Sequence, residues 1–320
     1  MSAPRQIAIL IGLTAVLCGL WSAALRVLPR PALAETNYEA NRLRLEEWLL
    51  GPGSKAVLVG SSMSGRLLPS YFDGTPLAGI ANLGLDGASP DTGLRLTLMR
   101  RPSPALVLLE GHLLSKRPGP NDSQLLELGT GVGMQITALA PLTRADARPS
   151  TVLYGWLKER RGGPEASAGG PESPAGAVTA RVVSAAQAEK DAAGLDPDWR
   201  PRIRSLITTL QEQGARVVLV RLPSGIGDPV DPEVPNELDA VAGELGLPLV
   251  DLLRLSRKGQ VAVSYTDGLH LTPKAARSVC RILAEAVAGA GWVGTEVGGS
   301  ETGRSGGGPG LGPGSNGTSR

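Results

Sequence analysis

Short runs rich in valine and leucine alternate with longer amphipathic stretches between residues 56 and 290. The runs have the length and composition of strands buried on both faces, and the stretches between them are typical of helices. The expected strands are Ala56–Val59, Ile80–Leu85, Ala105–Leu109, Arg216–Val220 and Pro248–Leu252. The expected helices are Glu35–Leu50, Asp91–Arg101, Trp199–Gln213, Asn236–Leu245 and Pro273–Ala290. This alternation predicts a flavodoxin-like three-layer α/β/α sandwich with about five parallel strands.

An uncharged apolar run, Ile7–Leu25, precedes this domain. Its length is close to what a helix needs to cross a bilayer. Arg5 precedes the run and Arg26 follows it, so the flanking charges leave the orientation open. We expect residues 1–30 to form an uncleaved, single-pass membrane anchor, with the domain on the extracytoplasmic side. The alternative is a signal peptide cleaved after the Ala-Leu-Ala at 32–34.

The other segments carry weaker patterns. Residues 31–54 are interpreted as a linker and a helix, and residues 55–290 as the folded domain. Residues 113–197 show no clear period, and within them the Gly/Pro/Ala-rich stretch 161–177 predicts a disordered insert. Residues 291–320 form a Gly/Ser-rich tail with no fold signal.

Composition narrows the classes of function. A formal net charge of +2 argues against nucleic-acid binding through bulk charge. The two cysteines, Cys18 and Cys280, fall in the apolar span and in an expected helix, so a disulfide is not expected. No Cys/His cluster has the spacing of metal ligands, and the sequence therefore predicts neither a metal site nor a cofactor.

Polar residues stand where the first strand ends and where the last helix begins. Gly60-Ser61-Ser62 ends the first strand, and sheets of this kind bind ligands at the carboxyl ends of their strands. Asp267 and His270 lie just before Thr272-Pro273, a helix-start pattern that would hold their loop rigidly. A serine nucleophile needs a base and an orienting carboxylate held in this way. We therefore expect Ser62, Asp267 and His270 to converge; the alternative is a serine-rich turn and a histidine that caps the last helix.

The chain order Ser…Asp…His, with Asp-x-x-His before the last helix, resembles that of the SGNH, or GDSL-type, hydrolases. Their first block is a strand ending in Gly-Asp-Ser, which implies that Ser62 is the nucleophile and that Ser61 replaces the aspartate. Their second block ends in a glycine whose N–H helps to bind the oxyanion, and Gly87 matches it. The resemblance covers roughly residues 55–290 and implies the same flavodoxin-like fold.

The third block departs from the family pattern. The family has an asparagine near the end of the third strand, where this chain has Glu110-Gly111-His112. His112 is the nearest polar candidate for this third oxyanion donor, beside the N–H groups of Ser62 and Gly87. Its alternative role is that of a histidine packed at a strand end. Glu110 is interpreted as an anchor of the strand end rather than as an acid.

Arg221 ends the fourth strand and would face the same crevice. It would bind an anionic or sugar substrate there, or else form a surface salt bridge.

The resemblance implies a membrane-anchored serine esterase or O-acyltransferase that acts on an ester, such as O-acetyl groups of surface or exported polysaccharide. The implied partners are the membrane, an ester or acylated carbohydrate, and polysaccharide-assembly proteins. The alternative is a non-catalytic SGNH-fold protein that binds or assembles other components at the membrane, which the missing asparagine and the replaced aspartate favour. The absence of Gly-x-Ser-x-Gly from residues 55–290 disfavours an α/β-hydrolase.

Overall fold

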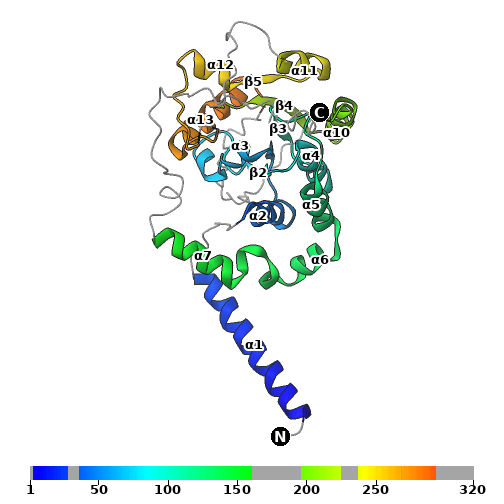
Figure 1. The fold of residues 1–320 in the computed structure, drawn as a ribbon, viewed down its shortest axis with the longest axis vertical. Helices are drawn as coiled ribbons and strands as arrows, with labels where there is room; N and C mark the ends of the chain where they lie inside the picture. The colour runs from blue at the N-terminus through cyan, green and yellow to red at the C-terminus, as the bar shows by residue number, and fades with distance from the viewer. Residues whose placement is uncertain (1–2, 28–35, 161–195, 225–236, 268, 293–320) are drawn as a thin grey trace, which may run out of the picture.

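A computed structural model describes residues 3–27, 36–160, 196–224, 237–267 and 269–292. At its centre is a five-stranded parallel sheet with helices on both faces (Figure 1). The strands are β1 (Ala56–Gly60), β2 (Ala81–Gly84), β3 (Leu106–Glu110), β4 (Arg216–Arg221) and β5 (Leu249–Asp251). Their order, β2-β1-β3-β4-β5, is the flavodoxin-like order, so the predicted fold class is confirmed. The expected insert at 161–177 and nearly all of the expected tail lie outside the described residues.

The helices expected from the sequence are present, with ends shifted by a few residues. They are α1 (Ala3–Val27), α2 (Asn37–Leu50), α4 (Pro90–Met99), α10 (Trp199–Glu212), α11 (Glu237–Leu245) and α13 (Pro273–Gly289). Helices that the sequence did not predict are α3 (Ser62–Gly65), α5 (Pro120–Thr130), α6 (Val132–Leu139), α7 (Pro149–Arg160) and α12 (Leu252–Arg257). Three short 3-10 helices join them: η1 (Pro69–Phe72), η2 (Pro141–Thr143) and η3 (Ala145–Ala147).

The central strand β1 shows why the domain has three layers. All five of its residues are buried. Val57 and Val59 belong to a core cluster that includes residues of α2, α4, α10 and α11, whereas Leu58 belongs to a second cluster that includes residues of α3 and α13. Successive side chains of a strand point to opposite faces, so a strand that is apolar at every position must be covered on both sides.

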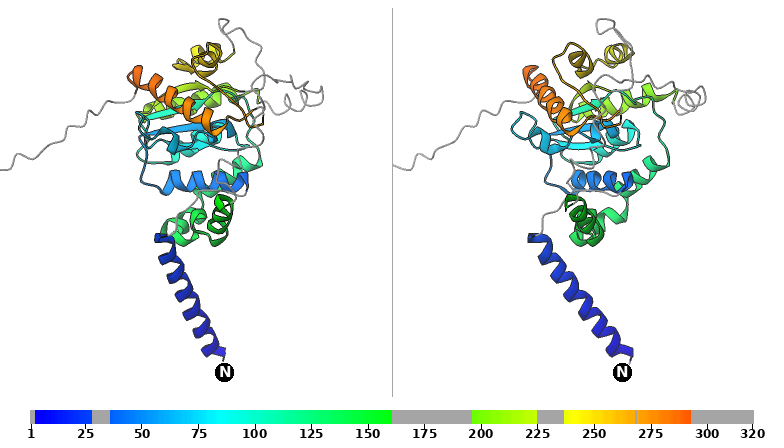
Figure 2. Two further views of the ribbon diagram at one scale, coloured as in Figure 1. Left: turned by 90° about the vertical axis from the view of Figure 1, so that its left-hand side faces the viewer. Right: turned by 60° about the vertical axis from the view of Figure 1, so that its left-hand side comes forward.

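Helix α1 projects from the body of the molecule as a straight rod (Figure 2). It is the one helix among the described residues that is long and apolar enough to cross a membrane, judged by length and composition. The span Ile7–Leu25 lies within it. Near its carboxyl end, Leu25 packs with Ala147 and Val152 of the domain. The side of the membrane on which the domain lies stays a prediction.

Candidate active site

Ser62 is the first residue of α3. One residue, the N-cap Ser61, separates it from the end of β1 at Gly60. The hydroxyl of Ser61 accepts a hydrogen bond of 3.2 Å from the N–H of Met63. Strand β1 lies between β2 and β3, where the direction of the strand order reverses. In doubly wound sheets this switch point, at the carboxyl ends of the strands, is the place of the ligand crevice.

A buried carboxylate holds the loop that carries Ser62. Glu110 ends β3, and its side chain is fully buried. Its Oε2 accepts hydrogen bonds from the N–H groups of Ser61, at 2.9 Å, and Ser64, at 3.1 Å. Its Oε1 accepts a hydrogen bond of 2.7 Å from the Ser61 hydroxyl. Three donors satisfy this buried carboxylate, and the backbone on both sides of Ser62 is thereby fixed.

The close packing around this loop requires glycine at Gly60. A Cβ atom there would lie 2.5 Å from both Cβ and Oε2 of Glu110 and 2.6 Å from the hydroxyl of Ser64. These distances are too short for any other residue, since the buried and hydrogen-bonded side chains of Glu110 and Ser64 cannot both move away. The glycine that ends β1 is therefore part of the support for Ser62.

Two side chains that sequence reasoning did not single out complete this support. The amide of Asn82 on β2 donates to the carbonyl oxygens of Ser64, at 2.9 Å, and Leu67, at 2.7 Å. The guanidinium of Arg44 on α2 donates to the carbonyl oxygens of Gly84, at 2.5 Å, and Gly65, at 3.2 Å. A polar amide inside an apolar strand was the available signal for Asn82, whereas nothing in the local sequence distinguishes Arg44.

The loop that carries Asp267 and His270 is fixed to the start of α13, as the sequence predicts. The side chain of Thr272 caps this helix by accepting a hydrogen bond of 3.3 Å from the N–H of Ala275, and Pro273 is its first residue. The hydroxyl of Ser264 lies 2.6 Å from that of Thr272. One face of α13 is buried in the core, so the cap ties the loop to a rigid element.

Within the loop, His270 is held by its own backbone. Its carbonyl oxygen accepts hydrogen bonds from the N–H of Thr266, at 2.9 Å, and the hydroxyl of Thr266, at 3.2 Å. Tyr265 and Leu271 form an isolated antiparallel bridge that closes the turn. The imidazole is therefore presented from a closed turn rather than from an open loop.

The structure brings Ser62, His270 and Asp267 together. Nε2 of His270 lies 3.0 Å from Oγ of Ser62, and Nδ1 lies 2.6 Å from Oδ2 of Asp267. Both distances are within hydrogen-bonding range. With a carboxylate at Nδ1, the neutral ring carries its proton there, and Nε2 is left to accept the proton of the serine hydroxyl. The predicted side-chain contacts are present, and the catalytic roles stay a prediction.

Asp267 is held as a carboxylate. Burial raises its pKa, but hydrogen bonds from the backbone N–H and the ring of His270 and from the N–H of Leu269 outweigh this effect and lower the pKa from 3.8 to about 2. The carboxylate is thus ionised at neutral pH. An anion beside Nδ1 stabilises the imidazolium that forms when His270 accepts a proton.

The other two predicted oxyanion donors stand beyond the strands that flank β1. Gly87 follows β2 and has a φ of 74°, a conformation that residues with a side chain rarely adopt. Its carbonyl oxygen accepts a hydrogen bond of 2.6 Å from Nζ of Lys116. His112 comes two residues after Glu110, is half-buried, and has its Nδ1 atom shielded from solvent. Both residues lie beyond the carboxyl ends of their strands, as expected, and their roles as oxyanion donors stay predictions.

Arg221 ends β4 as expected, but its contacts are those of a buried ion pair. Its guanidinium lies 2.7 Å from Oδ2 of Asp251 and 3.4 Å from Oδ2 of Asp239, and the residue is 5 % exposed. These carboxylates join β4 to β5 and α11. The described contacts therefore favour a structural ion pair, buried rather than at the surface, and give no support to a role in substrate binding.

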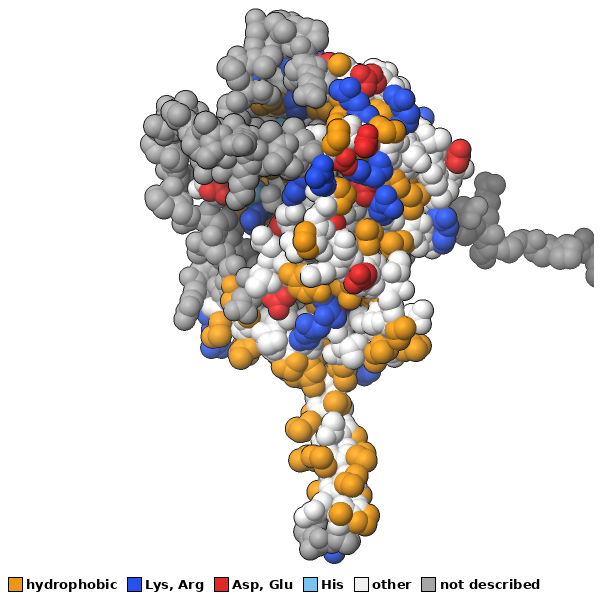
Figure 3. All heavy atoms as spheres, turned by 45° about the vertical axis from the view of Figure 1, so that its right-hand side comes forward, with side chains coloured by type: hydrophobic (Ala, Val, Ile, Leu, Met, Phe, Trp, Pro, Cys, Tyr) orange, Lys and Arg blue, Asp and Glu red, His pale blue; other side chains and the backbone are white. Residues whose placement is uncertain are grey.

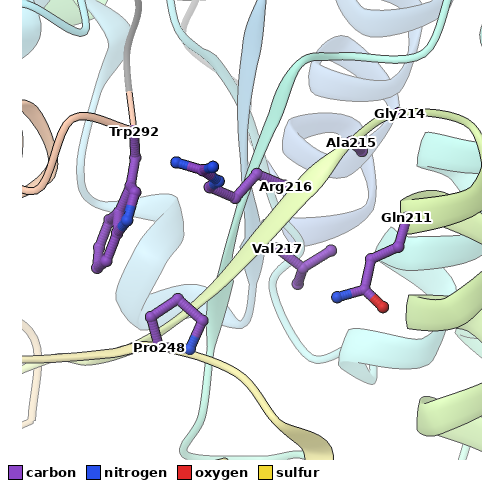
Figure 4. A pocket seen from close by; sticks show the side chains of 7 residues that line it. All are labelled: Gln211, Gly214, Ala215, Arg216, Val217, Pro248 and Trp292. Carbon is purple, nitrogen blue, oxygen red and sulfur yellow. The ribbon is translucent and has the colours of Figure 1, made fainter.

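A pocket at the opposite end of the sheet lies apart from this site. It is lined by Gln211, Gly214, Ala215, Arg216, Val217, Pro248 and Trp292 (Figure 4). These residues stand near the amino ends of β4 and β5, whereas Ser62 follows the carboxyl end of β1. In the part of the chain that is described, no group of three or more His, Cys, Asp or Glu side chains could hold a metal ion.

Comparison with protein-family models and with curated proteins finds no match for this chain. The likeness to the SGNH hydrolases thus rests on the residues quoted above.

Proposed function

We propose that the chain is a serine esterase or O-acyltransferase of the SGNH type, anchored in a membrane by α1. The observation that supports this proposal is the hydrogen-bonded series from Asp267 through His270 to Ser62. Ser62 and His270 are 208 residues apart in the sequence. A histidine that only capped a helix would need no contact with a serine so distant in the sequence.

In this proposal His270 takes the proton of the Ser62 hydroxyl as Oγ attacks the carbonyl carbon of the ester. Negative charge develops on the carbonyl oxygen, where the N–H groups of Ser62 and Gly87 and the ring of His112 would donate hydrogen bonds. When the bond to the alcohol breaks, Nε2–H gives its proton to the leaving oxygen, and the acyl group stays on Oγ. Water or an acceptor hydroxyl then gives its proton to His270 and attacks the acyl carbon. As the bond from the acyl carbon to Oγ breaks, Nε2–H of His270 returns that proton to Oγ, which regenerates the Ser62 hydroxyl and releases the acid or the new ester.

Turnover of an aryl ester by the purified full chain tests this assignment. Ser62→Ala should abolish turnover, and Asp267→Ala or His270→Ala should each remove most of it. The losses should not add in double variants, because the three residues act as a unit. Ser205→Ala, at an exposed position on α10, is the matched control and should leave turnover unchanged. Equal turnover by wild type and by Ser62→Ala would favour the non-catalytic, binding alternative.

We further propose that the ester belongs to surface or exported polysaccharide, such as its O-acetyl groups, and that the domain lies on the extracytoplasmic side. The SGNH resemblance and the apolar helix α1 support this proposal. Protease added to intact cells or spheroplasts should digest the domain while a cytoplasmic control protein survives. Protection of both proteins would show that the orientation is wrong.

A further inference from the structure

Six large apolar side chains are exposed on α6 and α7. They are Val132, Ile136, Leu139, Leu153, Trp156 and Leu157, which together are called the α6–α7 surface. Outside α1, the described residues include nine exposed large apolar side chains, so two thirds of them lie on these two helices. Single exposed apolar residues are normal, but a concentration of this kind marks an interaction surface.

Each of these helices differs from an ordinary surface helix, because its exposed face carries apolar side chains as well as its buried face. Helix α6 contains no charged residue, and its exposed Val132, Ile136 and Leu139 recur at the spacing of one helix face. Met134 and Thr137 are buried on the opposite face. The three exposed residues of α7 also share one face, at positions i, i+3 and i+4. A helix at a water-exposed surface normally turns its polar face outward.

These helices lie at the end of the domain from which α1 leaves (Figure 1). Nε1 of Trp21 on α1 donates a hydrogen bond of 2.7 Å to the carbonyl oxygen of Ala147 in η3. Leu25 packs with Ala147 and with Val152 of α7. Orange apolar side chains also gather at this end of the domain in the space-filling view (Figure 3). The α6–α7 surface therefore lies at the end of the domain at which the apolar helix α1 makes its contacts.

The position of α1 in a bilayer sets how far the α6–α7 surface lies from the hydrocarbon core. The hydrocarbon core takes about 20 helical residues, and the uncharged run Ile7–Leu25 supplies nearly that number before Arg26. Leu25 then lies at the boundary of the core and Trp21 about one helical turn inside it, close to the interface in which tryptophan is enriched. Because η3 and α7 contact these two residues, they lie at the same boundary.

We propose that the α6–α7 surface rests in the interface of the lipid bilayer beside α1. Its polar edge suits headgroups: the guanidinium of Arg160 stacks 4.9 Å from the ring centroid of Trp156. Helix α2 packs against both η3 and β2. Moving away from the membrane, helices α6 and α7 come first, α2 second and β2 third (Figure 1). The bilayer contact thus holds the β2 edge of the sheet toward the membrane and the β5 edge away from it. This inference rests on the proposed membrane anchor α1 and is independent of the catalytic proposal.

Depth-dependent quenching in the full chain, reconstituted into phosphatidylcholine vesicles, tests this inference. Cys18→Ala removes the exposed thiol, and Cys280 is fully buried, so a single introduced cysteine can be labelled with an environment-sensitive fluorophore. Labels on Leu139→Cys and Leu157→Cys should be quenched about twofold or more by lipids that carry a nitroxide near the headgroup, and shielded from iodide in water. The matched control, Ser205→Cys on α10, should show the opposite response.

Two outcomes of this experiment would contradict contact of the α6–α7 surface with the bilayer. Labels at positions 139 and 157 that respond like the label at position 205 would overturn the inference. Labels shielded from iodide but not quenched by the lipid nitroxide would also overturn it, because a second copy of the chain would then cover the surface. Both leucines are exposed, so the substitutions should fold, and circular dichroism of each labelled variant checks this.

Discussion

Replacing Glu110 should damage the candidate site without removing any group that touches substrate. Its carboxylate accepts hydrogen bonds from two backbone N–H groups and one hydroxyl, on both sides of Ser62. Glu110→Ala leaves the two N–H groups of Ser61 and Ser64 buried without this acceptor. Glu110→Gln keeps one oxygen for them, and its amide can donate to the Ser61 hydroxyl, so it loses mainly the charge of the acceptor.

The magnitudes follow from these contacts. Each buried donor left unsatisfied costs about 1–3 kcal/mol, so the alanine variant should lose roughly 2–6 kcal/mol of unfolding free energy. The glutamine variant should lose only about 1–2 kcal/mol. A shift of a nucleophile by about 1 Å can lower turnover on the order of a hundredfold. We expect a loss of about that size in kcat for Glu110→Ala and of about tenfold or less for Glu110→Gln.

Urea unfolding and aryl-ester kinetics of the purified full chain measure both effects. KM should change little, because Glu110 is fully buried and lies beneath the loop. Glu127→Ala, which removes an exposed carboxylate from α5, is the matched control. Wild-type stability and kcat in Glu110→Ala would refute the anchoring role. A stable Glu110→Gln variant as inactive as Ser62→Ala would show that the carboxylate transfers protons instead.

Three further predictions concern Asp267 in the loop before α13, His112 after β3 and Arg221 at the end of β4. The pKa of Asp267 is lowered from 3.8 to about 2, so its contribution to stability is present above pH 3.8 and is lost as the pH falls through about 2. The difference in unfolding free energy between wild type and Asp267→Asn should therefore be constant above about pH 5 and shrink below pH 4; a difference independent of pH would contradict this. His112→Ala should lower aryl-ester turnover about a hundredfold with little change in folding, and His112→Asn should retain or raise it; unchanged turnover or an unfolded variant would show that the histidine is structural. Arg221→Met should destabilise the fold by about 1–3 kcal/mol in urea unfolding, because it removes the 2.7 Å ion pair of Asp251 and leaves that carboxylate with Arg254 at 3.5 Å as its remaining cation; unchanged stability with a raised KM would support a role in substrate binding.

The sheet was predictable because each of its strands is a local signal. A strand buried on both faces is a continuous apolar run, and β1 begins at Ala56 as predicted and ends at Gly60, one residue beyond the expected end. The start of α13 was equally clear, since Thr272 and Pro273 are the N-cap and first residue that the sequence indicates. The apolar run Ile7–Leu25 in the same way predicted α1.

The segment from α5 to α7 was not predictable, for a physical reason. Helical periodicity indicates a helix when one face is apolar and buried and the other is polar. In α6 the exposed face is apolar as well, so the pattern has no clear period. The short helix α12 was missed because its first residue, Leu252, reads as the end of the strand before it.

The site was predictable only in part. Ser62, Asp267 and His270 stand beside a strand end and a helix start, which are visible locally. The bonds that hold Ser62 join distant segments: Ser61 and Glu110 are 49 residues apart, and Arg44 and Gly84 are 40 apart. The ion pair of Arg221 likewise depends on carboxylates from β5 and α11, which one strand end cannot reveal.

Reaction of the full chain with a fluorophosphonate tests most directly whether Ser62 is an activated nucleophile. Mass spectrometry of the intact chain and of its peptides then shows how many serines react and which ones. A hydroxyl 3.0 Å from Nε2 of His270 should give a single adduct on Ser62, absent from Ser62→Ala and strongly slowed in His270→Ala. A folded wild-type chain that forms no adduct, or forms it on another serine, would contradict the catalytic assignment.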